Sequence, residues 1–319
     1  MTDAGPLGEL EVEGLARDTA LTVGVFDGVH RGHLHLLRTL RERASARGLA
    51  TGVVTLHPHP ALVLHPTAGI VYLMSLEERV RLLRAGGVDF VLPLTFTAEV
   101  ARLSAADFLA GLQERLRMRF LLAGPDFALG RGREGGGEAL ERLSADAGFE
   151  VESVGPLVEE GLVVSSSAIR AALESGDIAC VNRLLGRTFS LAGPVVRGVE
   201  RGRVIGFPTA NIAVGSGLAL PPFGVYVTRA SVEGKSYRSV TNIGRRPTFE
   251  DGERTVEVHI IDFSGDLYGR ELRIDVLKRL RGEVRFAGTD ALTEQIGRDV
   301  EEARQYFERA PEAVAESSA

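Results

Sequence analysis

Short apolar runs alternate with helical patterns over the first part of the chain. From residue 20 to about residue 180, the runs predict strands, and stretches with apolar residues at every third or fourth position predict helices. The expected strands are residues 20–26, 50–57, 89–93, 120–124 and 150–154. The expected helices between them are residues 33–47, 76–85, 105–117 and 137–147. This order predicts an α/β domain whose parallel sheet is covered by helices on both faces.

The pattern changes near residue 190. Two helical segments, residues 166–175 and 177–185, close the first part. Beyond them glycine and proline become frequent, and apolar residues alternate with period two, as in Val256-Glu257-Val258-His259-Ile260. This pattern predicts an antiparallel barrel or sandwich, followed by a helix over residues 289–308. The fold class is therefore expected to be α/β plus β, with domains at residues 1–187 and 188–319.

Composition narrows the classes of function. The 319 residues carry a net charge of −6, which gives no global attraction for nucleic acid. No apolar run approaches the roughly 20 residues that span a membrane, and the acidic N-terminal segment lacks the apolar centre of a secretion signal. The single cysteine, Cys180, excludes an internal disulfide and suits a reducing compartment. These features favour a cytoplasmic protein that acts on small molecules, without nucleic acid or membrane as partners; the sequence does not specify partner proteins.

The basic residues are distributed unevenly. Lysine occurs only at Lys235 and Lys278, so 35 of the 37 basic residues are arginine. Any phosphate contact in the first 234 residues must therefore use arginine, histidine or backbone N–H groups. Six of the seven histidines fall between His30 and His65. They either line one site or gather there partly by chance.

The segment Gly24-Val25-Phe26-Asp27-Gly28-Val29-His30-Arg31-Gly32-His33 carries the strongest chemical signal. It follows the first expected strand and precedes the first expected helix. Backbone N–H groups at a helix start point outward and bind anions, so we expect a nucleotide phosphate here. The alternatives are a tight turn with a helix cap, or a metal site at His30, His33 and His35.

Further polar segments follow the later strands. Ligands gather at the carboxyl ends of parallel strands, so residues 57–60 and 124–127 are expected at the same edge as the histidine segment. Residues 165–170, Ser-Ser-Ser-Ala-Ile-Arg, form either an ordinary helix cap or a set of hydroxyls and a guanidinium for phosphates. The glycine run at residues 135–137 predicts a flexible loop before a helix.

The second part of the chain holds its own polar motif, Gly206-Phe207-Pro208-Thr209-Ala210-Asn211. It is either a proline turn that enters a strand or a ligand site. Thr209 and Asn211 alternate onto one face and offer two oxygen ligands, which suits Mg²⁺. Glu257 is expected to project inward from a strand that is otherwise apolar on that side, and a buried carboxylate needs a partner or a task.

Taken in order, these motifs resemble those of the bacterial bifunctional riboflavin kinase/FAD synthetases. The segment with HxGH resembles the signature of the adenylyltransferase module, and residues 58–60, 124–130 and 165–170 resemble its later blocks. Ser167 stands where threonine is usual, and Leu129 where an aromatic residue is usual. The kinase module is resembled by residues 206–211, 241–248, 256–260 and 262–269. Over about residues 20–308, the resemblance implies an N-terminal Rossmann-like nucleotidyltransferase domain and a C-terminal riboflavin kinase-like barrel with a terminal helix.

The resemblance implies a bifunctional enzyme of FAD biosynthesis that uses Mg²⁺. Riboflavin and ATP would give FMN, and FMN with a second ATP would give FAD and pyrophosphate. The implied catalytic residues are His30, His33, Arg170 and Glu257. Glu257 would take the proton of the ribityl 5′-hydroxyl, and the FMN phosphate would itself attack the α-phosphorus.

The resemblance also implies the binding residues of both modules. ATP contacts in the adenylyltransferase are implied for Gly24, Phe26, Asp27, Gly28, His30, His33, Ser166, Ser167 and Arg170. Flavin contacts in that module are implied for His59, Pro60, Asp126 and Phe127. ATP or flavin contacts in the kinase are implied for Gly206, Pro208, Thr209, Asn211, Asn242 and Arg246, with Mg²⁺ on Thr209 and Asn211.

Two alternatives for the second part remain. In the first, the kinase module is inactive, although Thr209, Asn211 and Glu257 are intact. In the second, the barrel binds nucleic acid, which calls for a basic face with stacking aromatic side chains. Residues 185–288 carry many arginines, but also several carboxylates and few aromatic residues.

Overall fold

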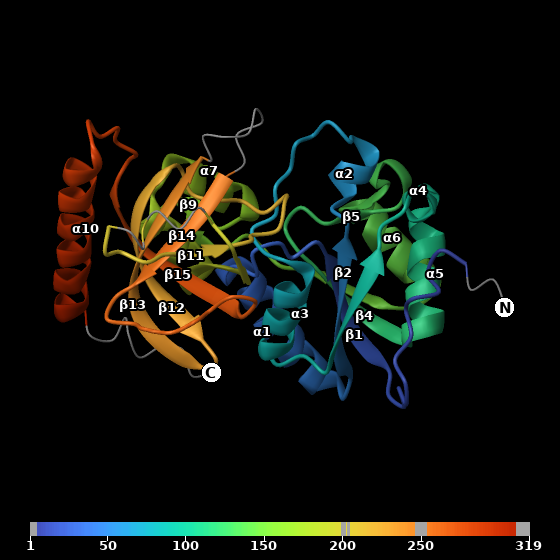
Figure 1. Ribbon diagram of the computed structural model, residues 1–319. Helices are drawn as coiled ribbons and strands as arrows, with labels where there is room; N and C mark the ends of the chain where they lie inside the picture. The colour runs from blue at the N-terminus through green and yellow to red at the C-terminus, as the bar shows by residue number, and fades with distance from the viewer. Residues whose placement is uncertain (1–4, 199–201, 203–204, 246–253, 311–319) are drawn as a thin grey trace. The chain divides into compact units, whose positions relative to one another are not determined.

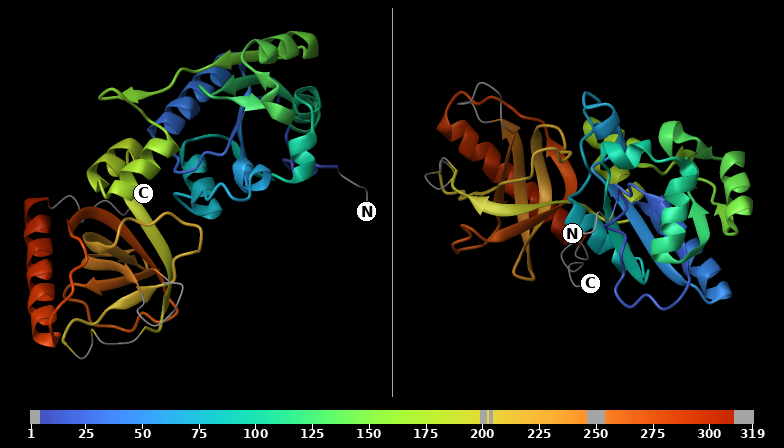
Figure 2. Two further views of the ribbon diagram at one scale, coloured as in Figure 1. Left: turned by 90° about the horizontal axis from the view of Figure 1, so that it is seen from above. Right: turned by 90° about the vertical axis from the view of Figure 1, so that its right-hand side faces the viewer.

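The computed structural model describes residues 5–198, 202, 205–245 and 254–310. The chain divides into two compact units, Met1–Ser166 and Ser167–Ala319. The first is an α/β unit, and the second contains a β-barrel (Figures 1 and 2).

The first unit is built on a parallel sheet of five strands. Their order across the sheet is β3-β2-β1-β4-β7. The strands are β1 (Thr19–Gly24), β2 (Ala50–His57), β3 (Phe90–Thr95), β4 (Met118–Ala123) and β7 (Glu150–Ser153). Each lies within a few residues of the expected strand, and the parallel arrangement is confirmed.

Helices cover both faces of this sheet. They are α1 (Arg31–Arg47), α3 (Leu76–Ala85), α5 (Ala105–Leu116) and α6 (Glu138–Ala147). Successive residues of a strand point to opposite faces, and β1 shows this directly. Ala20 packs into one apolar cluster with Leu37 of α1 and Leu83 of α3, whereas Leu21 packs into another with Leu112 of α5 and Leu140 of α6. A strand buried on both faces is mostly apolar, as in the central strands β1 and β2, whereas the edge strand β7 is polar and has no buried residue.

Shorter elements connect the sheet. They are α2 (Pro60–Leu64), α4 (Ala98–Arg102), β5 (Ala128–Leu129), the 3₁₀ turn η1 (Arg131–Arg133), β6 (Gly135–Gly136), β8 (Val158–Glu159) and β9 (Leu162–Val163). The expectation of a flexible loop at residues 135–137 is wrong, because Gly135 and Gly136 pair with β5. A Cβ atom at Gly135 would lie 2.6 Å from that of Ala105, so glycine here permits a close approach rather than flexibility.

The second unit contains a closed antiparallel barrel, which decides between the expected barrel and sandwich. The strand order is β10-β11-β14-β13-β12-β15. The strands are β10 (Phe189–Val196), β11 (Ala210–Ile212), β12 (Gly224–Val232), β13 (Lys235–Arg245), β14 (Arg254–Ile260) and β15 (Glu271–Arg281). The terminal helix α10 (Thr289–Arg309) lies along the outside of the barrel (Figure 2). Its Ala303 and Phe307 pack against Val225, Val227 and Val240.

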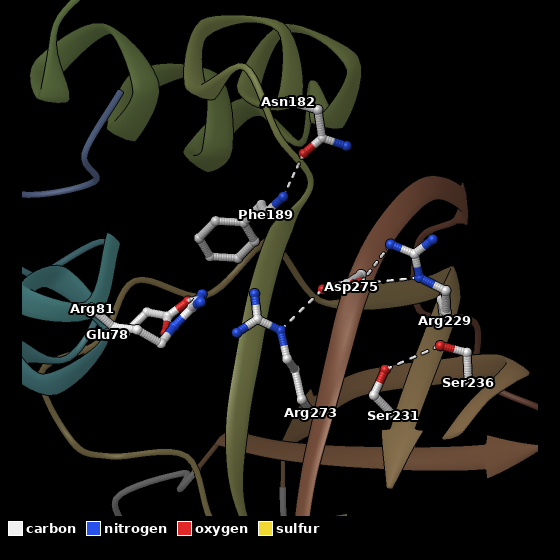
Figure 3. A network of polar contacts seen from close by, with 9 residues as sticks. All are labelled: Glu78, Arg81, Asn182, Phe189, Arg229, Ser231, Ser236, Arg273 and Asp275. Carbon is white, nitrogen blue, oxygen red and sulfur yellow. Dashed lines mark hydrogen bonds and ion pairs between the residues drawn. The ribbon is translucent and has the colours of Figure 1, made fainter. Parts of the chain in front are cut away.

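Two further helices, α7 (Ser166–Ser175) and α8 (Ile178–Leu185), precede the barrel. Asn182 of α8 accepts a hydrogen bond from the Phe189 N–H at 2.7 Å and donates one to the Val276 carbonyl at 3.0 Å. These contacts fix α8 to the first and last strands of the barrel. Figure 3 shows the Asn182–Phe189 contact.

A buried ion pair crosses the strands of the barrel. Arg229 Nη2 lies 2.8 Å from Asp275 Oδ2, and both side chains are nearly inaccessible to solvent. Arg273 Nε approaches the other carboxylate oxygen at 3.3 Å (Figure 3). The carboxylate thus holds both arginines on the barrel wall, so Arg229 is already neutralised within the fold.

Among the described residues, each helix is too short or too polar to cross a membrane.

Candidate active sites

The strand order makes the carboxyl ends of β1 and β4 the favoured position for a ligand. The chain passes from β1 to β2 and β3 on one side, then returns to β4 on the other side of β1. Such a reversal leaves a crevice outside the strand ends, where ligands bind in open α/β sheets. Residues 25–33 follow β1 and residues 124–127 follow β4. The topology therefore brings the predicted ATP segment and part of the predicted flavin segment to the same edge.

The turn after β1 has an unusual backbone. Phe26 and Val29 have φ angles of 55° and 38°, and Gly28 has a φ of 85°. A positive φ is rare for bulky and β-branched residues, so surrounding contacts must hold the turn. The Val29 N–H donates to the Phe26 carbonyl at 3.1 Å, and Thr55 Oγ1 donates to the Val25 carbonyl at 3.0 Å. Strain of this kind is typical of binding sites.

His30 and His33 cap the start of α1 reciprocally. The His33 N–H donates to His30 Nδ1, and the His30 N–H donates to His33 Nδ1, both at 3.3 Å. The rings stack with centroids 3.6 Å apart. An Nδ1 atom that accepts a hydrogen bond carries no proton, so this geometry assigns neutral imidazoles with Nε2–H donors. His30 is buried and His33 is half-buried, and Phe26 contacts the His33 ring edge-on.

The Asp27 carboxylate lies inside the protein, with 2% of the residue exposed. It accepts hydrogen bonds from the Leu73 N–H at 3.0 and 3.1 Å, and Arg79 Nη2 lies 4.0 Å away. Its carbonyl accepts a hydrogen bond from Ser166 Oγ at 2.7 Å. Asp27 therefore supports the turn from its buried side. Ser166, the last residue of the first unit, therefore contacts the turn after β1.

Ser167 and Arg170 continue this block in α7 and belong to the second unit. Ser167 is exposed and Arg170 is half-buried. The boundary between the two compact units thus passes through the predicted phosphate-binding block.

The predicted flavin residues lie after β2 and β4. His59 caps α2 through Nδ1, which accepts a hydrogen bond from the Ala61 N–H at 3.1 Å, and Pro60 is the first residue of that helix. The His59 N–H donates to the Tyr72 hydroxyl. Asp126 is exposed, and its carbonyl accepts a hydrogen bond from Arg133 at 2.9 Å. Phe127 is half-buried against the apolar core, so part of its ring stays accessible.

The second site lies on neighbouring strands of the barrel. Glu257 of β14 is paired directly with Asn211 of β11 and with Asn242 of β13. Paired residues on adjacent antiparallel strands point to the same face, with Cβ atoms about 5 Å apart. The fold therefore brings a carboxylate and two amides together. Asn211 is buried, and any side chain at Gly198 would collide with its amide.

The expectation that Glu257 projects into the barrel is wrong. Val240 faces α10 on the outside of the barrel, and Asn242 shares that face because it lies two positions along β13. Glu257 is paired with Asn242, so it also lies on the outer face. The neighbouring Val256 and Val258 are buried on the opposite, inner side.

The entry to β11 is held by backbone contacts. The Phe207 N–H donates to the Gly202 carbonyl at 2.8 Å, and His259 Nδ1 donates to the Pro208 carbonyl at 2.9 Å. Gly206 adopts a φ of 85°, and a Cβ atom at Gly202 would lie 3.3 Å from Thr209 Oγ1. Thr209 precedes Asn211 by two positions, so both can face Glu257. Arg246 lies outside the described residues.

Two residues near these candidate sites are not predicted by the sequence motifs. Arg79 belongs to an ordinary helical pattern, yet its side chain is completely buried. The sequence feature that indicates this burial is the position of Arg79 between Leu76 and Leu83, on the apolar face of the helix. Glu283 lies close to Gly244 and Asn242, since a Cβ atom at Gly244 would be 2.7 Å from Glu283 Oε1. Its segment carries no periodic pattern from which this could be predicted.

Comparison with known proteins identifies a family for each part of the chain. The model of the FAD synthetase family matches residues 13–168, and that of the riboflavin kinase family matches residues 185–307. The bifunctional riboflavin kinase/FMN adenylyltransferase of Escherichia coli K12 is 40% identical over 289 residues, which cover 90% of this chain and 92% of the relative. The protein of the same name from Bacillus subtilis is 36% identical over 294 residues, with coverage of 91% and 92%.

A crystal structure from Streptococcus pneumoniae, named a macrolide-efflux protein, has the same fold. Its TM-score is 0.83 at 32% identity, over 91% of this chain and 94% of that one. The fold and the family matches define a two-domain transferase of flavin metabolism. The chain belongs to the family of bifunctional riboflavin kinase/FMN adenylyltransferases.

Proposed function

We propose that this chain makes FAD from riboflavin in two reactions, each of which uses one ATP. The observation that carries the proposal is that one chain holds both family domains, with one polar cluster at the carboxyl ends of the sheet strands and another on paired strands of the barrel. The substrates are small molecules: riboflavin, FMN and ATP. The product FMN of the barrel is the substrate of the α/β unit.

In the barrel, the ribityl 5′-hydroxyl of riboflavin attacks the γ-phosphorus of ATP. Glu257 accepts the proton of that hydroxyl, the bond to the β-phosphate oxygen breaks, and ADP leaves. Asn211 and Asn242, which flank Glu257, orient the carboxylate and the reacting groups. We include Gly206, Pro208 and Arg246 among the residues that bind ATP or flavin.

Magnesium is part of this proposal. Thr209 and Asn211 supply the hydroxyl and amide oxygens that Mg²⁺ accepts, on the strand face that carries Glu257. These two residues would hold the ion. When bound, Mg²⁺ neutralises charge on the phosphates of ATP.

In the α/β unit, a phosphate oxygen of FMN attacks the α-phosphorus of ATP, and pyrophosphate leaves. The Nε2–H groups of His30 and His33 and the backbone at the start of α1 stabilise the developing charge. Gly24, Phe26 and Gly28 shape the turn, with Asp27 beneath it. Ser166, Ser167 and Arg170 complete the phosphate contacts. His59, Pro60, Asp126 and Phe127 hold the flavin.

The proposal includes neither nucleic acid nor a membrane. Arginines of the second unit are paired within the fold, such as Arg229 of the barrel with Asp275 and Arg304 of α10 with Asp262, which argues against a basic binding face. We also propose the cytoplasm as the compartment, where the single cysteine, Cys180, would stay reduced.

The decisive experiment separates the two reactions in one protein. With riboflavin, ATP and Mg²⁺, chromatography of the flavins should show FMN and then FAD. Glu257→Gln should abolish FMN formation and leave the conversion of added FMN into FAD intact. The double change His30→Asn and His33→Gln should do the reverse, because both new side chains can still cap α1 but carry no imidazole.

His35→Gln is the matched control, since it lies on the same helix outside the capping pair. It should leave both reactions unchanged. Loss of adenylylation in this control would show that the effect is not confined to the capping pair. Loss of both reactions in either folded test variant would show that the division of labour is wrong.

A further inference from the structure

A buried cation lies beneath the turn of the α/β unit. The Arg79 side chain of α3 is completely inaccessible to solvent. Its Nη2 lies 4.0 Å from Asp27 Oδ1, and its Nη1 donates to the Leu56 carbonyl at 3.2 Å. The guanidinium carbon lies 5.4 Å from the centroid of the Tyr72 ring. Arg79 thus contacts the turn after β1, the end of β2 and the segment before α3.

Tyr72 and Leu73 form a second connection between the same places. The Leu73 N–H donates to both Asp27 carboxylate oxygens, at 3.0 and 3.1 Å. The Tyr72 hydroxyl accepts the N–H of His59. Two adjacent residues therefore join Asp27, in the ATP segment, to His59, in the flavin segment. The Tyr72 ring rests beside the Arg79 guanidinium, so both connections meet at one cation.

The geometry of arginine differs from that of lysine at this position. A buried charge is stable when it is paired and hydrogen-bonded, and Asp27 and the Leu56 carbonyl supply such partners. The guanidinium is planar and directs its donors along fixed directions, whereas an ammonium group is a single point charge. A guanidinium of fixed geometry can hold two chain segments in register, that is, at a fixed position relative to each other. Alignment of two substrates is sensitive to this register, because a displacement of about 1 Å can lower a rate by about 10²-fold.

We propose that Arg79 is a positioning residue for FMN adenylylation, acting with Tyr72 to fix the ATP segment and the flavin segment relative to each other. This inference rests on the proposed adenylylation at the turn. Arg79 itself touches neither substrate. It acts through Asp27 on the turn and through Tyr72 on His59.

The test uses Arg79→Lys and Tyr72→Phe in the full chain. The first keeps the charge and removes the fork, and the second removes only the acceptor of the His59 N–H. Each should lower kcat for FAD formation from FMN by about tenfold or more, with a smaller change in the KM for ATP. Riboflavin phosphorylation by the barrel of the same molecules should stay within about twofold of the original rate.

Arg43→Lys is the matched control. Arg43 lies in the same unit and forms a two-pronged ion pair with Glu152, at 2.7 to 3.0 Å, but it contacts neither the turn nor His59 in any hydrogen bond given by the structure. Its replacement should leave kcat unchanged.

A double variant separates positioning from general destabilisation. If Arg79 and Tyr72 act as one unit, the double variant Arg79→Lys with Tyr72→Phe should be no less active than the less active of the two single variants. Independent effects that multiply would overturn the proposal. So would a Tyr72→Phe protein that keeps adenylylation within about twofold, and this variant decides alone if Arg79→Lys does not fold. Absence of FAD formation by the unaltered chain would instead overturn the proposed function.

Discussion

The imidazole of His57 ends β2 and faces the ring of Tyr72, with centroids 5.4 Å apart. Its Nδ1 is buried, and no described residue forms a hydrogen bond with it. Burial lowers the pKa of His57 below its ordinary value of 6.5, and the charge of Arg79 lowers it further, whereas Glu77 raises it. The folded protein therefore keeps His57 neutral at pH values just below 6.5, at which the same side chain would be protonated in the unfolded chain.

This shift predicts a pH dependence of stability. Below the ordinary pKa the unfolded state binds a proton that the folded state does not, so stability falls as the pH drops through 6.5 and levels off below the lowered folded value. Urea unfolding of the α/β unit should give a lower free energy at about pH 5.5 than at about pH 7.5. The decrease should be smaller in His57→Asn. An equal decrease in both proteins would assign it to other groups.

Sequence patterns predict the place of the candidate site residues in the fold better than they predict the direction of their side chains. The spacing of His30 and His33 after a strand predicts their place at a helix start, because strand, turn and helix are local. The direction of the Asp27 carboxylate depends on Leu73 and Arg79, which are distant in sequence. Residue spacing cannot predict such long-range contacts.

At the level of elements, α10 is fastened to the barrel by a buried carboxylate. Asp299 accepts hydrogen bonds from Arg281 Nε and Nη2, the shortest at 2.7 Å, and from Gln295 at 2.9 Å. Asp299 is 4% exposed, and the Arg281 side chain is 21% exposed. The pair is shielded from water, so the loss of one partner leaves a poorly solvated charge.

Asp299→Ala should therefore lower the free energy of unfolding of the barrel by about 2 kcal/mol. Calorimetry should show the barrel transition at a lower temperature, with the transition of the α/β unit unchanged. Glu302→Ala is the control on the same helix. Its partner is Lys278 at 3.1 Å, and both side chains are about half exposed, so the change should be below about 1 kcal/mol. Equal effects would contradict the argument from burial.

The elements themselves are largely predictable, whereas the faces of the barrel strands are not. Helices and strands of the α/β unit match their expected ranges because period and burial coincide there. The inward orientation expected for Glu257 is wrong although β14 itself alternates, with Val256 and Val258 buried and Glu257 only partly buried between them. Along β12, eight of nine residues are buried, so alternation does not distinguish inside from outside. The pairing register settles the question, and register is a property of several strands together.

For the whole molecule, the position of α7 and α8 makes a prediction about fragments. The expected domains end at residue 187, whereas the compact units divide after Ser166. A fragment of residues 1–187 should form FAD from FMN, and one of residues 1–166 should not, because it lacks Ser167 and Arg170. Chromatography of the flavins measures both. Equal activity of the two fragments would remove Arg170 from the proposed site.

The helices between the two expected domains also contact the barrel. Asn182 of α8 binds the backbone of β10 and β15, and Leu184 and Leu185 are buried. Residues 167–319 therefore include contacts that residues 188–319 lack. These two helices combine residues of the predicted adenylylation site with contacts to the barrel, which local patterns alone would not reveal.

The central place of β1 in the sheet protects this strand from local unfolding. It is bordered by strands on both sides and is buried along nearly its whole length. Amide hydrogens of such a strand exchange with solvent only in the largest opening events. The reactive turn begins where this strand ends, so local breathing at the sheet edges leaves it undisturbed. Heat should consequently abolish FAD formation in the same cooperative event that melts the sheet, with no earlier inactive stage.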